Sequence, residues 1–271
     1  MIVTTGASGN VGGQLVALLA AAGEQVTAVS RRPADLPQGV RHVQVDLDDP
    51  ATLKQATTGA DALFLLVAGQ DPQAILEAAR SGGVRRVVLL SSQGAGTRPQ
   101  AYGHPVAFEE AVRHSGLAWT ILRPGGFHSN AYAWAPSIRT GRTAAAPFAT
   151  VGLPTIDPGD ITDVAATVLR EDGHAGRTYT LTGPAPTTPA ERAAAIGAAL
   201  GEPVRFTEQT SDQAREQMLN VMPEPVVEGT LAILGTPTEA ERTVSPHVEQ
   251  ILGRAPRSFT DWAARNVTAF R

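Results

Sequence analysis

The chain has no cysteine, and this absence excludes several kinds of chemistry. Without a thiol there are no disulfides, no thiolate nucleophiles and no zinc–thiolate sites. The six histidines show no spacing that would place metal ligands on one helix face, so we expect no metal site. Lysine is nearly absent too: arginine and lysine together number 22, and Lys54 is the only lysine.

Runs of positive charge and long apolar runs are also missing. The net charge is −4 and the arginines occur singly or in pairs, so we expect no nucleic-acid partner. The longest apolar run, near 62–68, has the length of a strand rather than of a membrane span, and we expect no membrane association. The first predicted strand begins at Ile2, which leaves no room for a targeting peptide. These features predict a cytoplasmic protein.

The most informative stretch that is present lies at the N-terminus. A β-branched run at 2–5 ends at Gly6, glycines recur at Gly9 and Gly12, and an apolar helix is predicted over 11–22. A strand, a glycine turn and a helix place a diphosphate on a helix N-terminus. The alternative is a flexible N-terminal turn. We predict dinucleotide binding by residues Gly6, Ala7, Ser8, Gly9, Asn10, Val11 and Gly12.

The rest of the first half alternates strands with helices. Further strands are predicted at 25–29, 40–45, 61–67, 85–90 and 118–122, with helices at 72–81 and 105–114. This alternation predicts an α/β fold, a Rossmann-like doubly wound parallel sheet. We expect residues 1–126 to form the NAD(P)-binding core. Residues 127–271 would form mainly a smaller α/β substrate-covering region, with about 160–182 packing back on the core.

The end of the second predicted strand indicates which nucleotide binds. An acidic residue there would bind the ribose 2′-hydroxyl of NAD, whereas arginine suits a 2′-phosphate. The sequence has Arg31 and Arg32 and no carboxylate, so we predict NADPH/NADP+ as the cofactor. The alternative is that both arginines belong to a solvated loop.

The other strand ends supply the remaining candidates. Asp46 and Leu47 follow the third strand and would contact the adenine, although Asp46 could instead cap a helix. By position we add residues after the fourth and fifth strands: Val67, Ala68, Gly69, Ser91 and Ser92 as cofactor contacts and Gln93 as a substrate contact. Glu109 and Glu110 are predicted to be solvated.

Several motifs resemble the NmrA-like atypical branch of the short-chain dehydrogenase/reductase superfamily, which includes NADPH:quinone oxidoreductases, dye reductases and NADP-sensing regulators. They are TGASGNVG at 5–12, VVLLSSQGA at 87–95, SGLAWTILRPGGFHSN at 115–130, IDPGDITDVAATVL at 156–169, GRTYTLTGP at 176–184 and LGRAPRSFTDWAARN at 252–266. The resemblance implies that Pro124, Gly125 and Phe127 border the nicotinamide and that Asn130 orders the following loop.

The sequence departs from the better-known members of that superfamily in its proton donor. They use a Tyr-x-x-x-Lys helix, but Tyr102 is followed four residues later by Val106, and Lys54 lies near the adenine side. Tyr102 or His104 could serve as a catalytic acid instead, although a lone histidine such as His104 is more often a surface or capping residue. Tyr132 and Trp134 could stack on a flat substrate or form the core of the covering region.

These observations predict an NADPH-dependent oxidoreductase that transfers a hydride to a conjugated small molecule such as a quinone, an enone or a dye. One alternative is an NADP(H) sensor without turnover, and another is a biosynthetic isomerase or cyclase on the same fold. We expect a monomer or a homodimer.

Overall fold

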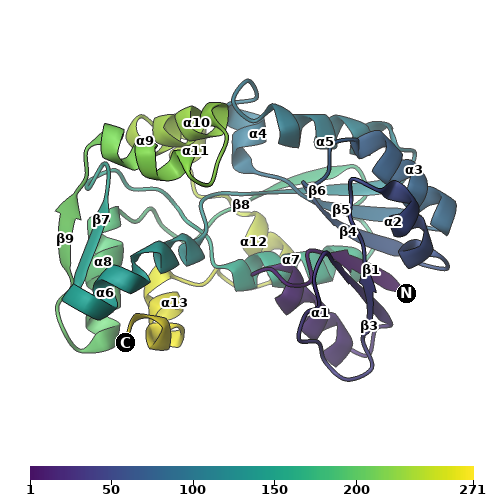
Figure 1. The fold of residues 1–271 in the computed structure, drawn as a ribbon, viewed down its shortest axis with the longest axis horizontal. Helices are drawn as coiled ribbons and strands as arrows, with labels where there is room; N and C mark the ends of the chain where they lie inside the picture. The colour runs from purple at the N-terminus through teal and green to yellow at the C-terminus, as the bar shows by residue number, and fades with distance from the viewer. The chain divides into compact units, whose positions relative to one another are not determined.

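A computed structural model describes residues 1–271, and its chain forms two compact units (Figure 1). The first unit comprises Met1–Ala95, Gly103–Pro124 and Pro158–Thr180. The second comprises Gly96–Tyr102, Gly125–Asp157 and Leu181–Arg271. Each unit is therefore built from three separate stretches of the sequence.

The first unit is organised around a seven-stranded sheet with the order β3-β2-β1-β4-β5-β6-β8. The strands are β1 (Ile2–Thr5), β2 (Val26–Ser30), β3 (Arg41–Gln44), β4 (Ala62–Leu66), β5 (Arg86–Leu90), β6 (Ala118–Pro124) and β8 (Arg177–Leu181). All neighbouring pairs from β3 across to β6 are parallel. The chain reverses its direction of travel across the sheet at β1, so the carboxyl ends of β1 and β4 flank a topological switch point. The predicted Rossmann-like fold is confirmed.

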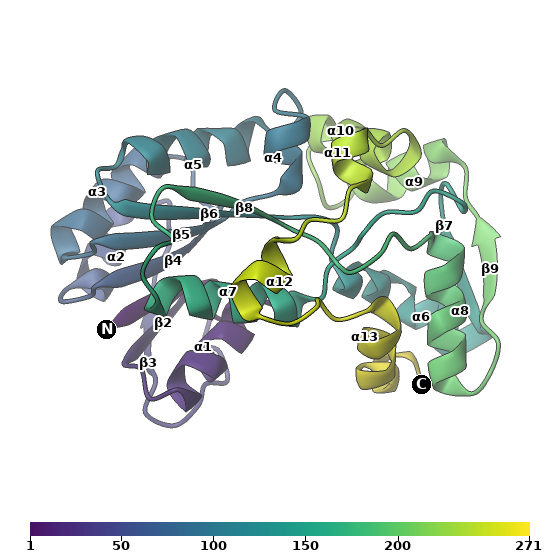
Figure 2. The same ribbon diagram turned by 180° about the vertical axis from the view of Figure 1, so that it is seen from behind.

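Helices cover both faces of this sheet, as the views from opposite sides show (Figures 1 and 2). One layer contains α2 (Pro50–Thr57), α3 (Pro72–Gly82), α4 (Gln93–Thr97) and α5 (Gly103–His114), and the other contains α1 (Gly12–Ala21) and α7 (Pro158–Arg170). Strand β4 is apolar throughout because it is covered on both sides. The main core joins strand residues such as Leu63 and Leu89 to Phe108 of α5.

The second unit has a small sheet and a separate core. Strands β7 (Thr143–Ala146) and β9 (Arg205–Glu208) pair in parallel. Its helices are η1 (His128–Trp134), α6 (Ala135–Gly141), α8 (Pro189–Leu200), α9 (Ser211–Leu219), α10 (Glu224–Gly235), α11 (Glu239–Arg242), α12 (His247–Leu252), α13 (Phe259–Arg265) and η2 (Val267–Phe270). Ile138, Ile196, Phe259, Trp262 and Phe270 are central to its core.

Helix starts in the second unit are specified by local sequence. Helices α8, α9, α11 and α13 each begin with a capping box, in which a Ser or Thr and the residue three positions later satisfy each other's backbone N–H groups. In the first unit, Asp49 caps α2 and Asp71 caps α3, each followed by proline. Helix α1 has no side-chain cap. No helix is both long enough and apolar enough to cross a membrane.

Candidate functional site

The glycine turn after β1 is closely packed, both against the Leu66 side chain and against its own backbone. Gly6 has φ +67°, and a Cβ there would lie 2.1 Å from Leu66 Cδ1. A Cβ at Gly12 would lie 2.3 Å from the Gly6 carbonyl oxygen, so any larger residue would push the helix off the turn. The Gly9 N–H donates to the Gly6 carbonyl at 2.9 Å, which closes the turn. The geometry of the loop therefore requires glycine at positions 6 and 12, whereas a Cβ at Gly9 would meet only the Gly6 carbonyl oxygen, at 3.3 Å.

This turn leads directly into the uncapped N-terminus of α1. The residue at the cap position, Val11, has no side-chain acceptor for the first N–H groups of the helix. Ser8, Gly9 and Asn10 are exposed in front of it. Backbone N–H groups of this kind, together with the helix dipole, suit a diphosphate. The turn and the helix start therefore fit a dinucleotide, with Gly6 to Gly12 as its predicted contacts.

Arg31 and Arg32 are both exposed immediately after β2, and neither forms an ion pair. The preceding Ser30 is not available for a ligand, since its hydroxyl donates to the Arg32 carbonyl at 2.5 Å and contacts His42 Nε2 at 2.9 Å. These bonds fix the start of the loop. Two unpaired guanidinium groups are thus presented beside the end of β2.

The loops after β3 and β4 are bonded to each other. Asp48 accepts a hydrogen bond from the Gln70 N–H at 2.9 Å, and a Cβ at Gly69 would lie 2.9 Å from the Leu47 carbonyl. Asp46 accepts from the Asp48 N–H at 3.2 Å, whereas the cap of α2 is Asp49. Asp46 therefore does not cap α2, and the adenine contact stays a prediction for this residue. Leu47, Val67, Ala68 and Gly69 are all half-buried at this end of the sheet.

A buried carboxylate lies behind the ends of β5 and β6. Glu109 is 1% exposed and accepts bonds from the Ser91 hydroxyl at 2.7 Å, Arg113 at 2.7 Å and both Nε and Nη2 of Arg123 at 2.8 and 2.6 Å. The prediction that Glu109 is solvated was wrong. Burial alone would raise the pKa of Glu109, but the hydrogen bonds from Arg123, Ser91 and Arg113 outweigh it and lower that pKa below its ordinary value.

The Glu109 network fixes the residues around the predicted nicotinamide end. Ser91 directly follows β5, and Arg123 immediately precedes Pro124 at the end of β6. Because Ser91 donates its only hydroxyl proton to Glu109, it can act toward a ligand only as an acceptor. The neighbouring Ser92 is half-buried and accepts from the Gly94 N–H at 3.1 Å, and Gln93 begins α4.

In the second unit, the segment after β6 contains a buried histidine that the sequence analysis did not single out. The Gly125 N–H donates to Leu181, Phe127 bridges to Ile156, and His128 Nδ1 contacts the Thr155 hydroxyl at 3.0 Å. Burial lowers the pKa of His128 to about 4, against a smaller opposing effect of Asp157. His128 is therefore neutral near pH 7, and its ring packs edge-on against Phe259 and Trp262.

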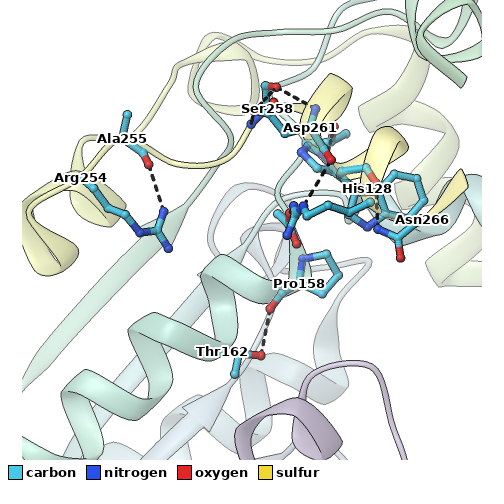
Figure 3. A network of polar contacts seen from close by, with 12 residues as sticks. His128, Pro158, Thr162, Arg254, Ala255, Ser258, Asp261 and Asn266 are labelled. Atoms are coloured by element: carbon cyan, nitrogen blue, oxygen red, sulfur yellow. Dashed lines mark hydrogen bonds and ion pairs between the residues drawn. The ribbon is translucent and has the colours of Figure 1, made fainter. Parts of the chain in front are cut away.

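The surroundings of His128 come mainly from the α13 segment (Figure 3). Ser258 and Asp261 form the capping box that begins this helix, and Arg265 pairs with the buried Asp157. The Tyr132 hydroxyl donates to Asn266 at 2.6 Å, and its ring packs with Trp262 and Phe270. Asn130, at the start of η1, is exposed.

The aromatic residues predicted to contact substrate belong to the core of the second unit. Tyr132 and Trp134 are both half-buried against that core, and Trp134 packs edge-on against Phe206. A residue that the sequence did not indicate lies beside them: the Arg192 guanidinium is 6.0 Å from the centre of the Trp134 ring. Of the two possible roles considered, core packing is observed for both aromatics.

Both candidate proton donors already have partners. The Tyr102 hydroxyl lies 3.2 Å from the Thr230 hydroxyl, within the second unit. His104 belongs to the first unit, where its Nε2 is 2.8 Å from the Gly69 carbonyl and its ring meets Phe108 edge-on. Because Nε2 faces a carbonyl oxygen, it carries the proton of this bond. The structure therefore places the two residues in different units and in different hydrogen bonds.

Comparison with known proteins adds three findings. Residues 6–172 match the NAD(P)H-binding family. The chain is 37% identical to the (4-alkanoyl-5-oxo-2,5-dihydrofuran-3-yl)methyl phosphate reductase of Streptomyces griseus, an alignment that covers 100% of this chain and 99% of the relative. It is 32% identical to the NAD(P)H azoreductase of Xenophilus azovorans, again over 100% of this chain and 99% of the relative.

The fold itself is found among solved structures. The NADPH-dependent quinone oxidoreductase QOR2 of Escherichia coli, solved in complex with NADPH, superimposes with a TM-score of 0.82. The alignment covers 98% of this chain and 99% of that structure at 23% identity. This likeness shows that the two chains share a fold.

Proposed function

Because the chain belongs to the NAD(P)H-binding family, within the NmrA-like atypical branch of the short-chain dehydrogenase/reductases, we propose that it reduces a conjugated small molecule with NADPH. That the protein is an NAD(P)H-dependent oxidoreductase follows from its family. The acceptor class, the preference for NADPH and the individual site residues make up the proposal. When bound, the reduced nicotinamide supplies a hydride to the acceptor.

The acceptors of the related enzymes share one chemical property. The names of the two full-length relatives specify an azo compound and an oxo-dihydrofuran bearing an alkanoyl group, and the QOR2 name specifies a quinone. Each of these molecules has a double bond conjugated to an electron-withdrawing group or to a second π system. A hydride added to such a molecule produces a delocalised anion, which needs less help from an acid than an alkoxide does.

The hydrogen bonds of the candidate donors support the same acceptor class, and this observation carries the proposal. The hydroxyl proton of Ser91 is donated to Glu109, and the Nε2 proton of His104 to Gly69. Tyr102 is bonded to Thr230 and lacks the lysine that would lower its pKa. A positioned general acid contributes typically 10²–10⁴-fold to a rate. Reduction of a quinone needs little of this acid catalysis, because the anion that forms resembles a phenolate, whose pKa is about 10.

The test is an acceptor panel in which NADPH oxidation is measured with a naphthoquinone, an azo dye, an α,β-unsaturated lactone and a saturated ketone. We expect turnover of the first three and little of the ketone. Tyr102→Phe and His104→Ala should each lower quinone turnover by less than about tenfold. Rapid reduction of the ketone, abolished by either substitution, would show that a dedicated acid exists.

A second outcome of the same panel would replace the proposed function. If NADPH binds tightly and no acceptor is reduced, the protein is an NADP(H) sensor rather than a reductase. Binding is therefore measured separately, by the fluorescence of NADPH titrated with protein, so that a failure of catalysis is not mistaken for a failure of cofactor binding.

A further inference from the structure

A histidine of β3 is joined through a serine of β2 to the loop that follows β2. His42 Nε2 lies 2.9 Å from the Ser30 hydroxyl oxygen, and that oxygen lies 2.5 Å from the Arg32 carbonyl oxygen. A carbonyl oxygen can only accept, so the Ser30 hydroxyl donates to it and accepts from the His42 N–H. These three groups, called here the His42 relay, therefore run in one direction, from β3 to the loop.

The first two members of the His42 relay belong to the sheet of the first unit. His42 pairs with Ala28 across β3 and β2, and Ser30 lies two residues further along β2, hence on the same face of the sheet. Ser30 is buried, and its carbonyl accepts from the Val45 N–H at 3.3 Å. His42 is half-buried. The relay therefore extends from groups that the sheet already holds in place.

The loop at 31–36 has no other hydrogen bond. Apart from the Arg32 carbonyl, no group of these residues forms a hydrogen bond or an ion pair within the protein. A β-turn closed by the backbone would need an N–H at position 33 for the Ser30 carbonyl, and Pro33 has none. The Ser30 side chain thus supplies a bond that the backbone cannot make here.

The segment held at this point carries both arginines that we predict to bind a 2′-phosphate. Arg31 lies between the end of β2 and the carbonyl that the relay holds, which belongs to Arg32 itself. Both side chains are exposed. Ordering a loop and its long side chains on binding costs free energy, and a loop that is already held lowers this cost. Holding the Arg32 backbone therefore favours a ligand that both arginines contact.

We propose that His42 and Ser30 are positioning residues that set the preference for NADPH over NADH without contacting the nucleotide. The inference rests on the proposed preference for NADPH, with Arg31 and Arg32 as the groups that bind the 2′-phosphate. His42 acts only through Ser30, and Ser30 acts through the backbone of Arg32. NADH has no 2′-phosphate, so its affinity does not depend on the His42 relay.

Binding tests the relay without turnover. NADPH and NADH are each titrated by their fluorescence into wild type and the variants, at one low salt concentration. Ser30→Ala removes the middle of the relay. His42→Phe keeps an aromatic ring but removes the N–H donor, whereas His42→Gln keeps an N–H donor at a similar reach. A further variant combines Ser30→Ala with His42→Phe. The control is His114→Phe, the same substitution at an exposed histidine of the same unit.

We expect Ser30→Ala to weaken NADPH binding about three- to tenfold, as for the loss of one hydrogen bond. His42→Phe should weaken it about two- to threefold, because Ser30 can still bond to Arg32 but is no longer held toward it. The combined variant should match Ser30→Ala. His42→Gln and His114→Phe should match wild type. The affinity for NADH should be unchanged in every variant.

Three results would overturn the proposal. A further loss of NADPH affinity when His42→Phe is added to Ser30→Ala would mean that His42 contacts the nucleotide itself. Equal losses for NADPH and NADH would mean that the relay only supports the fold. Unchanged NADPH affinity in Ser30→Ala and His42→Phe would mean that the loop does not need the relay. These two variants test the relay separately, so either one is sufficient if the other does not fold.

The outcomes also separate this inference from the proposed function. If Arg31→Ala and Arg32→Ala weaken NADPH binding while Ser30→Ala and His42→Phe do not, the NADPH preference stands and the relay fails. If wild type binds both nucleotides equally, the preference fails and the relay with it. If no acceptor is reduced, the titrations still decide on the relay. With a reduced acceptor, the two relay variants should raise the KM for NADPH and leave kcat unchanged, and a lower kcat at saturating NADPH would contradict the proposal.

Discussion

The two units build their candidate sites from different materials. In the first unit the groups at the strand ends are mainly backbone N–H groups, placed by Gly6, Gly9 and Gly12 at the start of α1. In the second unit the comparable groups are side chains, such as His128 and Arg192, set among aromatic rings. A backbone site binds whatever has the shape of a diphosphate, whereas a side-chain site can change its ligand with one substitution. The glycine turn therefore depends on the spacing of its glycines, whereas the polar groups of the second unit depend on individual side chains.

Each unit also contains one glutamate that is 1% exposed, and these form a matched pair. Glu109 binds Arg113 and Arg123 in the first unit, and Glu241 binds Arg98 in the second. The pKa of each carboxyl lies below its ordinary value because arginine hydrogen bonds outweigh the effect of burial. Glu241 therefore serves as a control for Glu109: a loss of NADPH affinity that occurs only on removing Glu109 cannot be explained by the loss of a buried carboxylate alone.

The largest effect is therefore expected from Glu109→Ala and Glu241→Ala. Each substitution leaves a half-buried arginine unpaired and should lower the free energy of unfolding by about 3–5 kcal/mol. Glu109→Ala should in addition weaken NADPH binding, because Ser91 and Arg123 lose the group that holds the ends of β5 and β6. Urea unfolding and NADPH titration measure the two effects. Equal NADPH affinities in the two variants would show that the Glu109 network is structural only.

The next effect concerns pH and the second unit. His128 has a folded pKa of about 4 against about 6.5 in the unfolded chain, so the unfolded state takes up a proton that the folded state refuses. The resulting stability is fully present above pH 6.5 and declines as the pH falls toward 4, by about 3 kcal/mol in all. Unfolding measured between these pH values should show this decline in wild type and in His114→Gln, an exposed control, and a clearly smaller decline in His128→Gln, where only carboxyls such as Glu109 and Glu241 still contribute.

A smaller effect, confined to the first unit, is expected from Gly12→Ala. The new Cβ would lie 2.3 Å from the Gly6 carbonyl, and relieving that overlap must move α1 away from the turn. NADPH affinity should fall about a hundredfold, since overpacking of this kind costs about 1–3 kcal/mol. Gly103→Ala introduces a Cβ with nothing within 4 Å and provides the control. An unchanged affinity in Gly12→Ala would mean that the turn does not bind the dinucleotide.

The smallest effect distinguishes the two nucleotides. Arg31→Ala and Arg32→Ala should each weaken NADPH about tenfold and leave NADH nearly unchanged, because each guanidinium would bind the 2′-phosphate. The effect is modest because both side chains are exposed and screened by salt. Titration of both nucleotides against both variants measures it. Equal losses for NADPH and NADH would remove these arginines from the discrimination.

What the sequence predicts well is what depends on neighbours along the chain. The strands and the glycine turn follow from local patterns, since β-branched runs and glycine spacing act within a few positions. The helix over 50–57 was not predicted, although Asp49 followed by Pro50 is a typical helix start. A closer reading of that pair would also have assigned the cap to Asp49 rather than Asp46.

The groups missed by sequence reasoning depend on contacts between distant segments. Glu109 and Glu110 look alike on a helix, but only Glu109 faces Arg123, and this follows from how α5 lies over β5 and β6. His128 is buried because Phe259 and Trp262 pack on it from the other end of the chain. The contact of Arg192 with the Trp134 ring likewise joins α8 to a segment more than fifty residues earlier. Contacts between segments that are far apart in the chain leave no pattern in the sequence around any one of these residues.

The absence of a side-chain cap on α1 has a consequence for the stability of this helix start in the free protein and in the complex. Asp49 and Asp71 each accept a hydrogen bond from one N–H group in the first turn of α2 and α3, whereas no side chain does this for α1. In the proposed complex the diphosphate of the cofactor would be the acceptor at α1. Amide hydrogens in the first turn of α1 should therefore exchange rapidly with deuterium in the free protein and slowly in the complex, while those of α2 and α3 change little. The supply of cofactor would then govern how long the folded chain survives a protease.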